Sequence, residues 1–234
     1  MVEINVEILT GKSEAHLATS GLWAGVLHAS VVAPFEALRA AAAEAGFDLS
    51  IVSGYRSFER QLAIWNGKVR GERAVLDDAQ TPIILERLSK AEQMHAILRW
   101  SALPGASRHH WGTDFDIVDA EALKLAKQPS GLPYRLKLTA EETEPGGIFA
   151  EMYTWLESYL PKTDFYRPYD LDRGGVGPEP WHLSYTPVAD HFAKAQNSES
   201  IVTALAGSGM ELEALVSAHI DELFIRYVRV PSKK

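Results

Sequence analysis

Residues 107–116 constrain this chain more than any other stretch, because they gather histidine and aspartate side chains around a glycine. His109 and Asp116 are separated by a short segment in which Gly112 permits a tight turn, so the two side chains can approach each other. A second cluster, residues 179–182, ends in another histidine. Two histidines and one aspartate amount to three metal ligands. We therefore expect a fold that brings these two segments together.

The chain contains no cysteine, which excludes both a disulfide framework and a thiolate metal site. A metal ion must then be bound by His, Asp and Glu. Three protein ligands leave one tetrahedral position open for water, as catalytic zinc sites require. Imidazole with a single carboxylate suits zinc and keeps the site close to charge balance. The sequence thus predicts one Zn²⁺ per chain, bound by His109, Asp116 and His182.

Two further side chains complete a hydrolytic site in this interpretation. Glu179 lies three residues before His182, where a general base can take a proton from water and pass it to a leaving amine. If the two residues between them are extended, both side chains can approach one metal from neighbouring directions. Arg56 follows a short predicted strand, and its planar guanidinium suits an oxyanion or a substrate carboxylate. Further pocket or substrate contacts are expected from Ser107, Tyr55, Trp111 and Trp181.

Composition limits the partners. The net charge of −8 argues against nucleic acid and anionic membranes, which both favour Lys/Arg patches. No apolar run reaches the roughly 18 residues of a membrane span, and the N-terminus lacks the features of a signal peptide. As written, the sequence favours a cytoplasmic location, while a periplasmic or extracellular location remains open.

Hydrophobic periodicity predicts mixed secondary structure. We expect helices over residues 22–33, 34–45, 58–65, 81–98, 148–159 and 188–222, and strands over 2–9, 49–53, 115–118, 134–138, 181–185 and 223–230. The motifs end before residue 187. We therefore predict a zinc peptidase domain over residues 1–186 and a C-terminal helical extension, residues 187–234, packed on the same domain. The tryptophans at 23, 65, 100 and 155 are predicted to be core residues.

The order of these motifs resembles the LAS metallopeptidases, the D-alanyl-D-alanine carboxypeptidases of the VanY type and their relatives. Ser-x-His-x-x-Gly-x-x-x-Asp is followed far downstream by Glu-x-x-His and preceded by Ser-Gly-Tyr-Arg-Ser. The resemblance covers roughly residues 48–186, and its matching positions are Ser53 to Ser57, Gln61, Ser107, His109, Gly112, Asp116, Glu179 and His182.

The resemblance implies an α+β fold, with a small central antiparallel sheet flanked by helices as in Hedgehog and D,D-peptidases. It also implies zinc at the three ligands, Glu179 as base, Arg56 as substrate or oxyanion contact, and Gln61 near the substrate. The implied substrates are peptidoglycan peptides, and the implied activity is removal of a terminal D-Ala from stem peptides. D,D-dipeptidase, L,D-carboxypeptidase and lysin-type endopeptidase activities stay open, as does a non-catalytic zinc module that binds cell-wall peptide.

One position departs from the pattern. Many relatives carry a small residue, typically Ala, where this chain has Asp114. Residues 114 and 116 point to the same side of a strand. Asp114 therefore orients a metal ligand, binds a substrate ammonium or competes for the metal, and we count it among the candidate substrate contacts.

Overall fold

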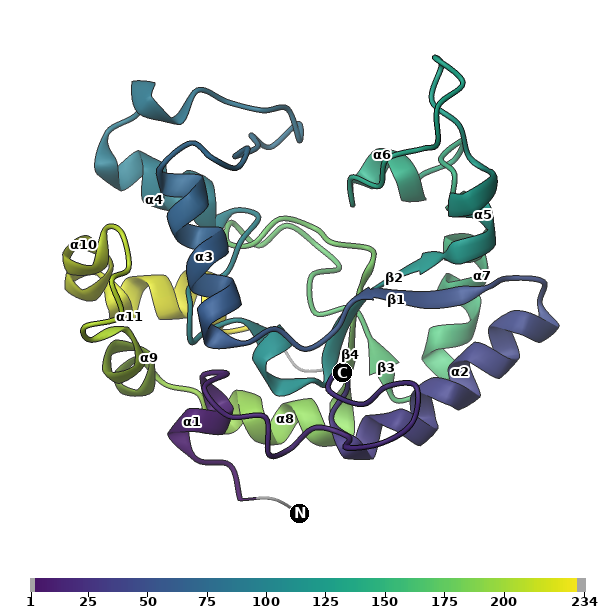
Figure 1. The fold of residues 1–234 in the computed structure, drawn as a ribbon, viewed down its shortest axis with the longest axis horizontal. Helices are drawn as coiled ribbons and strands as arrows, with labels where there is room; N and C mark the ends of the chain where they lie inside the picture. The colour runs from purple at the N-terminus through teal and green to yellow at the C-terminus, as the bar shows by residue number, and fades with distance from the viewer. Residues whose placement is uncertain (1–2, 231–234) are drawn as a thin grey trace.

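A four-stranded antiparallel sheet in the order β1-β2-β4-β3 forms the centre of the chain, which a computed structural model describes over residues 3–230. Its strands are β1 (Leu49–Ser53), β2 (Asp114–Asp119), β3 (Phe165–Tyr166) and β4 (His182–Tyr185). The sheet lies between two groups of helices (Figure 1). The predicted α+β class is therefore confirmed.

The register between β2 and β4 joins the two motifs of the sequence. Asp116 lies directly opposite His182, and Asp114 lies opposite Ser184. On the other side of β2, Ser53 pairs with Asp116 after a register shift in β1. Directly opposite residues in an antiparallel pair have their side chains within a few ångströms of each other. The sheet thus brings together segments that are far apart in the sequence.

One hydrophobic core lies between the sheet and two helices, α2 (Val32–Glu44) and α7 (Ala150–Tyr159). Phe115 and Ile117 of β2 belong to this core and are fully buried. Because successive side chains of a strand point to opposite faces, Asp114 and Asp116 lie on the other face. That face holds the candidate site.

A second core is built from α3 (Phe58–Val69), α4 (Lys90–Leu98) and the C-terminal extension. The extension supplies apolar side chains from α9 (Ser198–Leu205), α10 (Glu213–Ala218), α11 (Ile220–Leu223) and the π-helical turn η5 (Phe224–Val228). Before them, α8 (Thr186–Ala195) places Phe192 against Trp111, with stacked rings 5.6 Å apart. The extension therefore shares its core with the N-terminal part, whereas the division at residue 186 stays a prediction.

Short helices complete the described chain: α1 (Val6–Leu9), η1 (Ala29–Val31), η2 (Leu85–Arg87), η3 (Arg108–Trp111), α5 (Ala120–Leu125), α6 (Ala140–Thr143) and η4 (Leu160–Lys162). None of the helices in residues 3–230 is long and apolar enough to cross a membrane.

Several predicted elements are wrong. The expected strand over residues 2–9 is a helical turn, because Asn5 caps it by accepting a hydrogen bond from the Ile8 amide at 2.9 Å; residue 2 lies outside the described residues. Residues 134–138 form no strand, and residues 223–230 are largely helical. In the helix expected over 22–33, residues 22–27 form turns and a bend, and helical structure begins at Ala29. The helix expected from residue 81 begins only at Lys90, after a capping box formed by Ser89 and Glu92.

Candidate metal centre

The histidine of the first motif is brought back over the sheet by a turn that only glycine permits. Gly112 adopts a φ of +62°, and a Cβ at this position would lie 2.7 Å from the His28 amide nitrogen. Left-handed backbone and close approach both exclude a larger residue. The side chain of His109, which belongs to η3, therefore points toward Asp116 of β2.

The three predicted ligands converge from η3, β2 and β4. His109 Nε2 lies 3.5 Å from Asp116 Oδ2, and His182 Nδ1 lies 3.2 Å from Asp116 Oδ1. Their ligand atoms all lie within 4.8 Å of one another, and all three side chains are buried. The structure thus brings together the set expected from the sequence.

Two of these atoms need a partner. Asp116 Oδ1 and His182 Nδ1 are buried 3.2 Å apart, and neither has an assigned hydrogen-bond partner among the residues that the structure describes. An unsatisfied buried polar atom costs about 1–3 kcal/mol. A cation that takes both lone pairs would remove this cost, so the donor atoms fit a divalent metal with nitrogen and oxygen ligands.

The second ring nitrogen of His109, Nδ1, fixes the orientation of the ring for metal binding. Its Nδ1 lies 3.0 Å from the carbonyl oxygen of Gly54, so this nitrogen carries the proton and donates it. Burial, with Arg56 adding repulsion, lowers the pKa of His109 to about 3. The ring is therefore neutral, and the Nε2 lone pair faces Asp116.

His182 is held from behind by Asp114. Its Nε2 lies 3.2 Å from Asp114 Oδ1, which leaves Nδ1 facing Asp116. Burial alone would raise the pKa of Asp114, but Arg108 together with the hydrogen bonds from His182 and Thr113 lowers it to about 2. Asp114 is an ionised, fully buried acceptor outside the set of cavity-lining residues. Its contacts are those of a residue that orients a ligand.

Arg108 supplies the counter-charge, and the sequence reasoning missed it. Its Nε donates to Asp114 Oδ1 at 2.6 Å, and one terminal nitrogen donates to Ser184 Oγ at 2.8 Å and to Tyr166 Oη at 3.1 Å. The guanidinium also lies over the Trp111 ring. The sequence held one indication of this role: a carboxylate on a buried strand is paired with a cation or a metal, and Arg108 is close to Asp114 in the chain.

Glu179 lies beside the candidate ligands at the start of a turn. Its Oε2 is 3.5 Å from His182 Nδ1. The His182 amide donates to the Glu179 carbonyl oxygen at 3.1 Å, so the intervening residues form a turn and are not extended. Burial raises the pKa of Glu179 to about 7, despite the opposing effect of His182. The carboxyl group is thus poised to exchange a proton near neutral pH.

Arg56 is fixed with part of its guanidinium toward the cavity. Its two terminal nitrogens donate to Gln61 Oε1 and to Ser53 Oγ, each at 2.9 Å. Gln61 in turn donates to the Ala102 carbonyl oxygen at 2.7 Å and is fully buried. Gln61 therefore holds Arg56 in place and does not itself line the cavity.

A cavity of about 740 Å³ is lined by the three candidate metal ligands. Of the residues named from the sequence it is lined by Arg56, Ser107, His109, Asp116, Glu179, Trp181 and His182. Tyr55 and Trp111 do not line it: the Tyr55 hydroxyl donates to the Gly11 carbonyl oxygen, and Trp111 packs in a core. Sequence reasoning missed the cavity-lining side chains of Lys68, Arg135, Lys137 and Tyr169.

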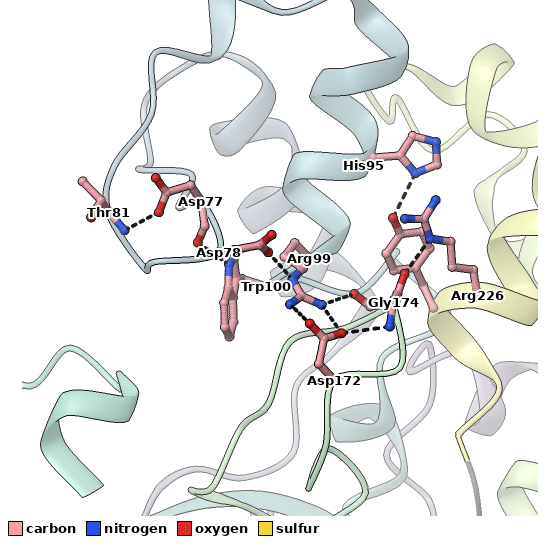
Figure 2. A network of polar contacts seen from close by, with 11 residues as sticks. Asp77, Asp78, Thr81, His95, Arg99, Trp100, Asp172, Gly174 and Arg226 are labelled. Atoms are coloured by element: carbon pink, nitrogen blue, oxygen red, sulfur yellow. Dashed lines mark hydrogen bonds and ion pairs between the residues drawn. The ribbon is translucent and has the colours of Figure 1, made fainter. Parts of the chain in front are cut away.

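Trp100 also lines the cavity, contrary to the prediction of a core residue. Figure 2 shows the polar network that holds it. Arg99 joins two loops through Asp78 at 2.7 Å and Asp172 at 2.5 Å, and Trp100 Nε1 donates to the Asp77 carbonyl oxygen. Gly177 leaves room for the Trp100 ring, since a Cβ there would lie 2.5 Å from it. Residues of both loops line the cavity, among them Leu76, Pro82 and Val176.

Comparison with known proteins finds similar sequences and a similar fold. Two uncharacterized proteins of Haemophilus influenzae (strain Rd) are similar. One is 44% identical over 105 residues, covering 44% of this chain and 72% of the relative. The other is 34% identical over 128 residues, covering 54% and 92%. A solved Zn(II) complex of a mutant of the vancomycin-resistance D,D-pentapeptidase VanY, from a VanB-type cassette, shares the fold with a TM-score of 0.50, at 23% identity over 81% of this chain and 91% of that one.

The family itself is shown by a longer match. The model of the VanY family, described as D-alanyl-D-alanine carboxypeptidase, matches residues 25–188, well over half of the chain. This range includes the three ligands, Glu179 and Arg56, and it confirms the resemblance inferred from the motifs. The chain belongs to the VanY D-alanyl-D-alanine carboxypeptidase family.

Proposed function

We propose that this chain is a zinc-dependent D,D-carboxypeptidase that removes the terminal D-Ala from peptidoglycan stem peptides. The observation that carries the proposal is the meeting of three buried ligands with Glu179 in one cavity. The family supports the reaction class, and the Zn(II) found in the VanY structure supports the metal.

The ligands of the ion would be His109, Asp116 and His182. Zinc bound there supplies Lewis acidity, which makes water a stronger acid and a peptide carbonyl a better electrophile. Glu179 accepts the proton that the attacking water loses and donates it to the leaving amine. Its raised pKa suits both transfers, because the group must be deprotonated before the attack and protonated before the bond breaks.

Arg56 faces the same cavity and supplies fixed positive charge. Because Gln61 and Ser53 hold its guanidinium, the arginine does not have to reorganise as negative charge develops on the substrate carbonyl oxygen. Ser107 lines the cavity next to the ligands and offers a hydroxyl to the peptide. Trp181 adds an apolar wall.

Asp114 acts on the metal through His182 in this account. Replacing it with asparagine should weaken zinc binding by about 10- to 100-fold, since outer partners of a ligating histidine have effects of this size. The measurement is a competition titration against a chromophoric chelator. Ser184→Ala is the matched control, because Ser184 contacts Arg108 in the same cluster without a contact to His182. Unchanged affinity in Asp114→Asn would limit Asp114 to neutralising Arg108.

A panel of tri-, tetra- and pentapeptide stems tests the proposed reaction. Mass spectrometry of the products should show the pentapeptide converted to tetrapeptide and free D-alanine, with the tetrapeptide left intact. Release of a D-Ala-D-Ala dipeptide would indicate a dipeptidase, and trimming of the tetrapeptide an L,D-carboxypeptidase. Peptide binding without any cleavage would indicate a non-catalytic binding module.

A further inference from the structure

Lys68, in the last turn of α3, is a cation of the cavity that the reaction above does not use. It lines the same cavity as Arg56 and Glu179. Within residues 3–230 its ammonium group takes part in no hydrogen bond and no ion pair. The side chain is partly buried. A charge removed from water without a fixed partner is costly unless a ligand supplies the partner.

The charges around Lys68 also favour the binding of an anion beside it. Burial lowers its pKa to about 8, and Arg56 and Arg73 act in the same direction while Glu179 opposes them. An anion bound beside Lys68, in addition to Glu179, would stabilise the ammonium and offset the effects of burial and of the two arginines on its pKa. At neutral pH the ammonium is still largely protonated, and its three rotatable donors suit a carboxylate.

The other cations of the cavity are differently placed. Five lysine and arginine side chains line it in the described part of the chain: Arg56, Lys68, Arg108, Arg135 and Lys137. Arg108 is neutralised by Asp114 at 2.6 Å, and Arg56 is held by its two neighbours. Arg135 is exposed, and Lys137 is exposed and 3.8 Å from Glu141. Lys68 therefore combines partial burial with a free donor group.

We propose that Lys68 is the specificity residue that binds the free C-terminal carboxylate of the peptide. The inference rests on the proposed function, because a carboxypeptidase must recognise a carboxylate one residue beyond the bond it cuts. It also divides the work between the cations: Lys68 anchors the chain end, and Arg56 is left to the carbonyl oxygen. The site would then favour peptides with a free chain end over peptides extended or blocked there.

Paired substrates distinguish this role from a general electrostatic effect on Glu179. The probes are N-acetyl-Lys-D-Ala-D-Ala and the same peptide with a C-terminal carboxamide, each tested for cleavage between the two D-alanines. The zinc-loaded protein should prefer the acid by about 100-fold in kcat/KM, the range expected for a hydrogen bond to a charged group. Lys68→Met should lower kcat/KM for the acid by a similar factor and leave the amide nearly unchanged, so that the ratio approaches one.

Two variants serve as controls. Lys68→Arg keeps the cation and should retain most of the preference for the acid. Arg135→Met removes a cation from the exposed part of the lining and should keep the acid-to-amide ratio. Zinc content and circular dichroism confirm that each variant is folded and loaded.

Equal losses on acid and amide in Lys68→Met would overturn the inference, because Lys68 would then act through Glu179. A ratio that moves with Arg135 and not with Lys68 would overturn it as well. If the unmodified protein cleaves neither peptide, the proposed function fails on its own. Calorimetric binding of both peptides to the zinc-loaded protein and to Lys68→Met then decides the inference, which predicts that only the acid loses affinity.

Discussion

Glu179→Gln should lower kcat by about 10²- to 10⁴-fold, the usual contribution of a positioned acid–base group. Glutamine keeps the size of the side chain but cannot accept the proton of the attacking water. Glu179 lies beside the ligands without being one of the three convergent residues, so the zinc content should remain at one ion per chain. Steady-state kinetics and metal analysis by mass spectrometry measure the two quantities.

The matched control is Glu141→Gln. Glu141 is exposed, with 82% of its side chain accessible, and it does not line the cavity. Its kcat should equal that of the unmodified protein. Full activity of a zinc-loaded Glu179→Gln variant would remove Glu179 from the role of base, and loss of zinc would instead make it a ligand.

Arg108→Met should destabilise the fold by about 3–5 kcal/mol, the usual cost of leaving one partner of a buried ion pair uncompensated. Both Arg108 and Asp114 are almost fully buried, so water cannot screen the remaining carboxylate. This is a large part of the total stability of a typical domain. Urea denaturation of the metal-free protein gives the free energy of unfolding directly.

Two further variants show whether the lost stability comes from the uncompensated charge of Asp114. Arg108→Met combined with Asp114→Asn should recover much of the lost stability, because the uncompensated charge is gone. Arg70→Met removes an arginine from a solvent-exposed ion pair with Glu72 and should change stability little. An Arg108→Met variant as stable as Arg70→Met would show that the buried pair contributes nothing to the fold.

The buried pair also predicts a dependence on pH. The folded-state pKa of Asp114 is lowered to about 2, below its ordinary value near 4. Its ionised form therefore stabilises the native state above pH 4, and this contribution is lost as the pH falls toward 2. Acid should destabilise the unmodified protein more steeply over this interval than it destabilises the double variant.

The convergence of the three candidate ligands was predictable because they lie in two short motifs with fixed spacing. His109 and Asp116 are joined by a glycine turn, and β2 and β4 were both expected from their apolar patterns. The register that places Asp116 opposite His182 could not be derived from either segment alone. It depends on strand pairing between distant parts of the chain.

The missed residues share one cause. Lys68 and Trp100 reach the cavity because α3 and the loop after α4 pack around it, and Arg108 is read correctly only once its pairing with Asp114 is known. Local patterns carry no such information. The same limit explains the C-terminal end, where the apolar residues of 223–230 suggested a strand and instead complete the second core as helical turns.

The most direct test of the central claim is mass spectrometry of a muramyl pentapeptide incubated with zinc-loaded protein, with and without a chelator. We predict the loss of one D-alanine in the zinc-loaded sample, no loss after chelation, and recovery when zinc is restored. A pentapeptide left intact by the zinc-loaded protein would contradict carboxypeptidase chemistry at this site. Cleavage that persists after the zinc has been removed would contradict the role of the metal centre.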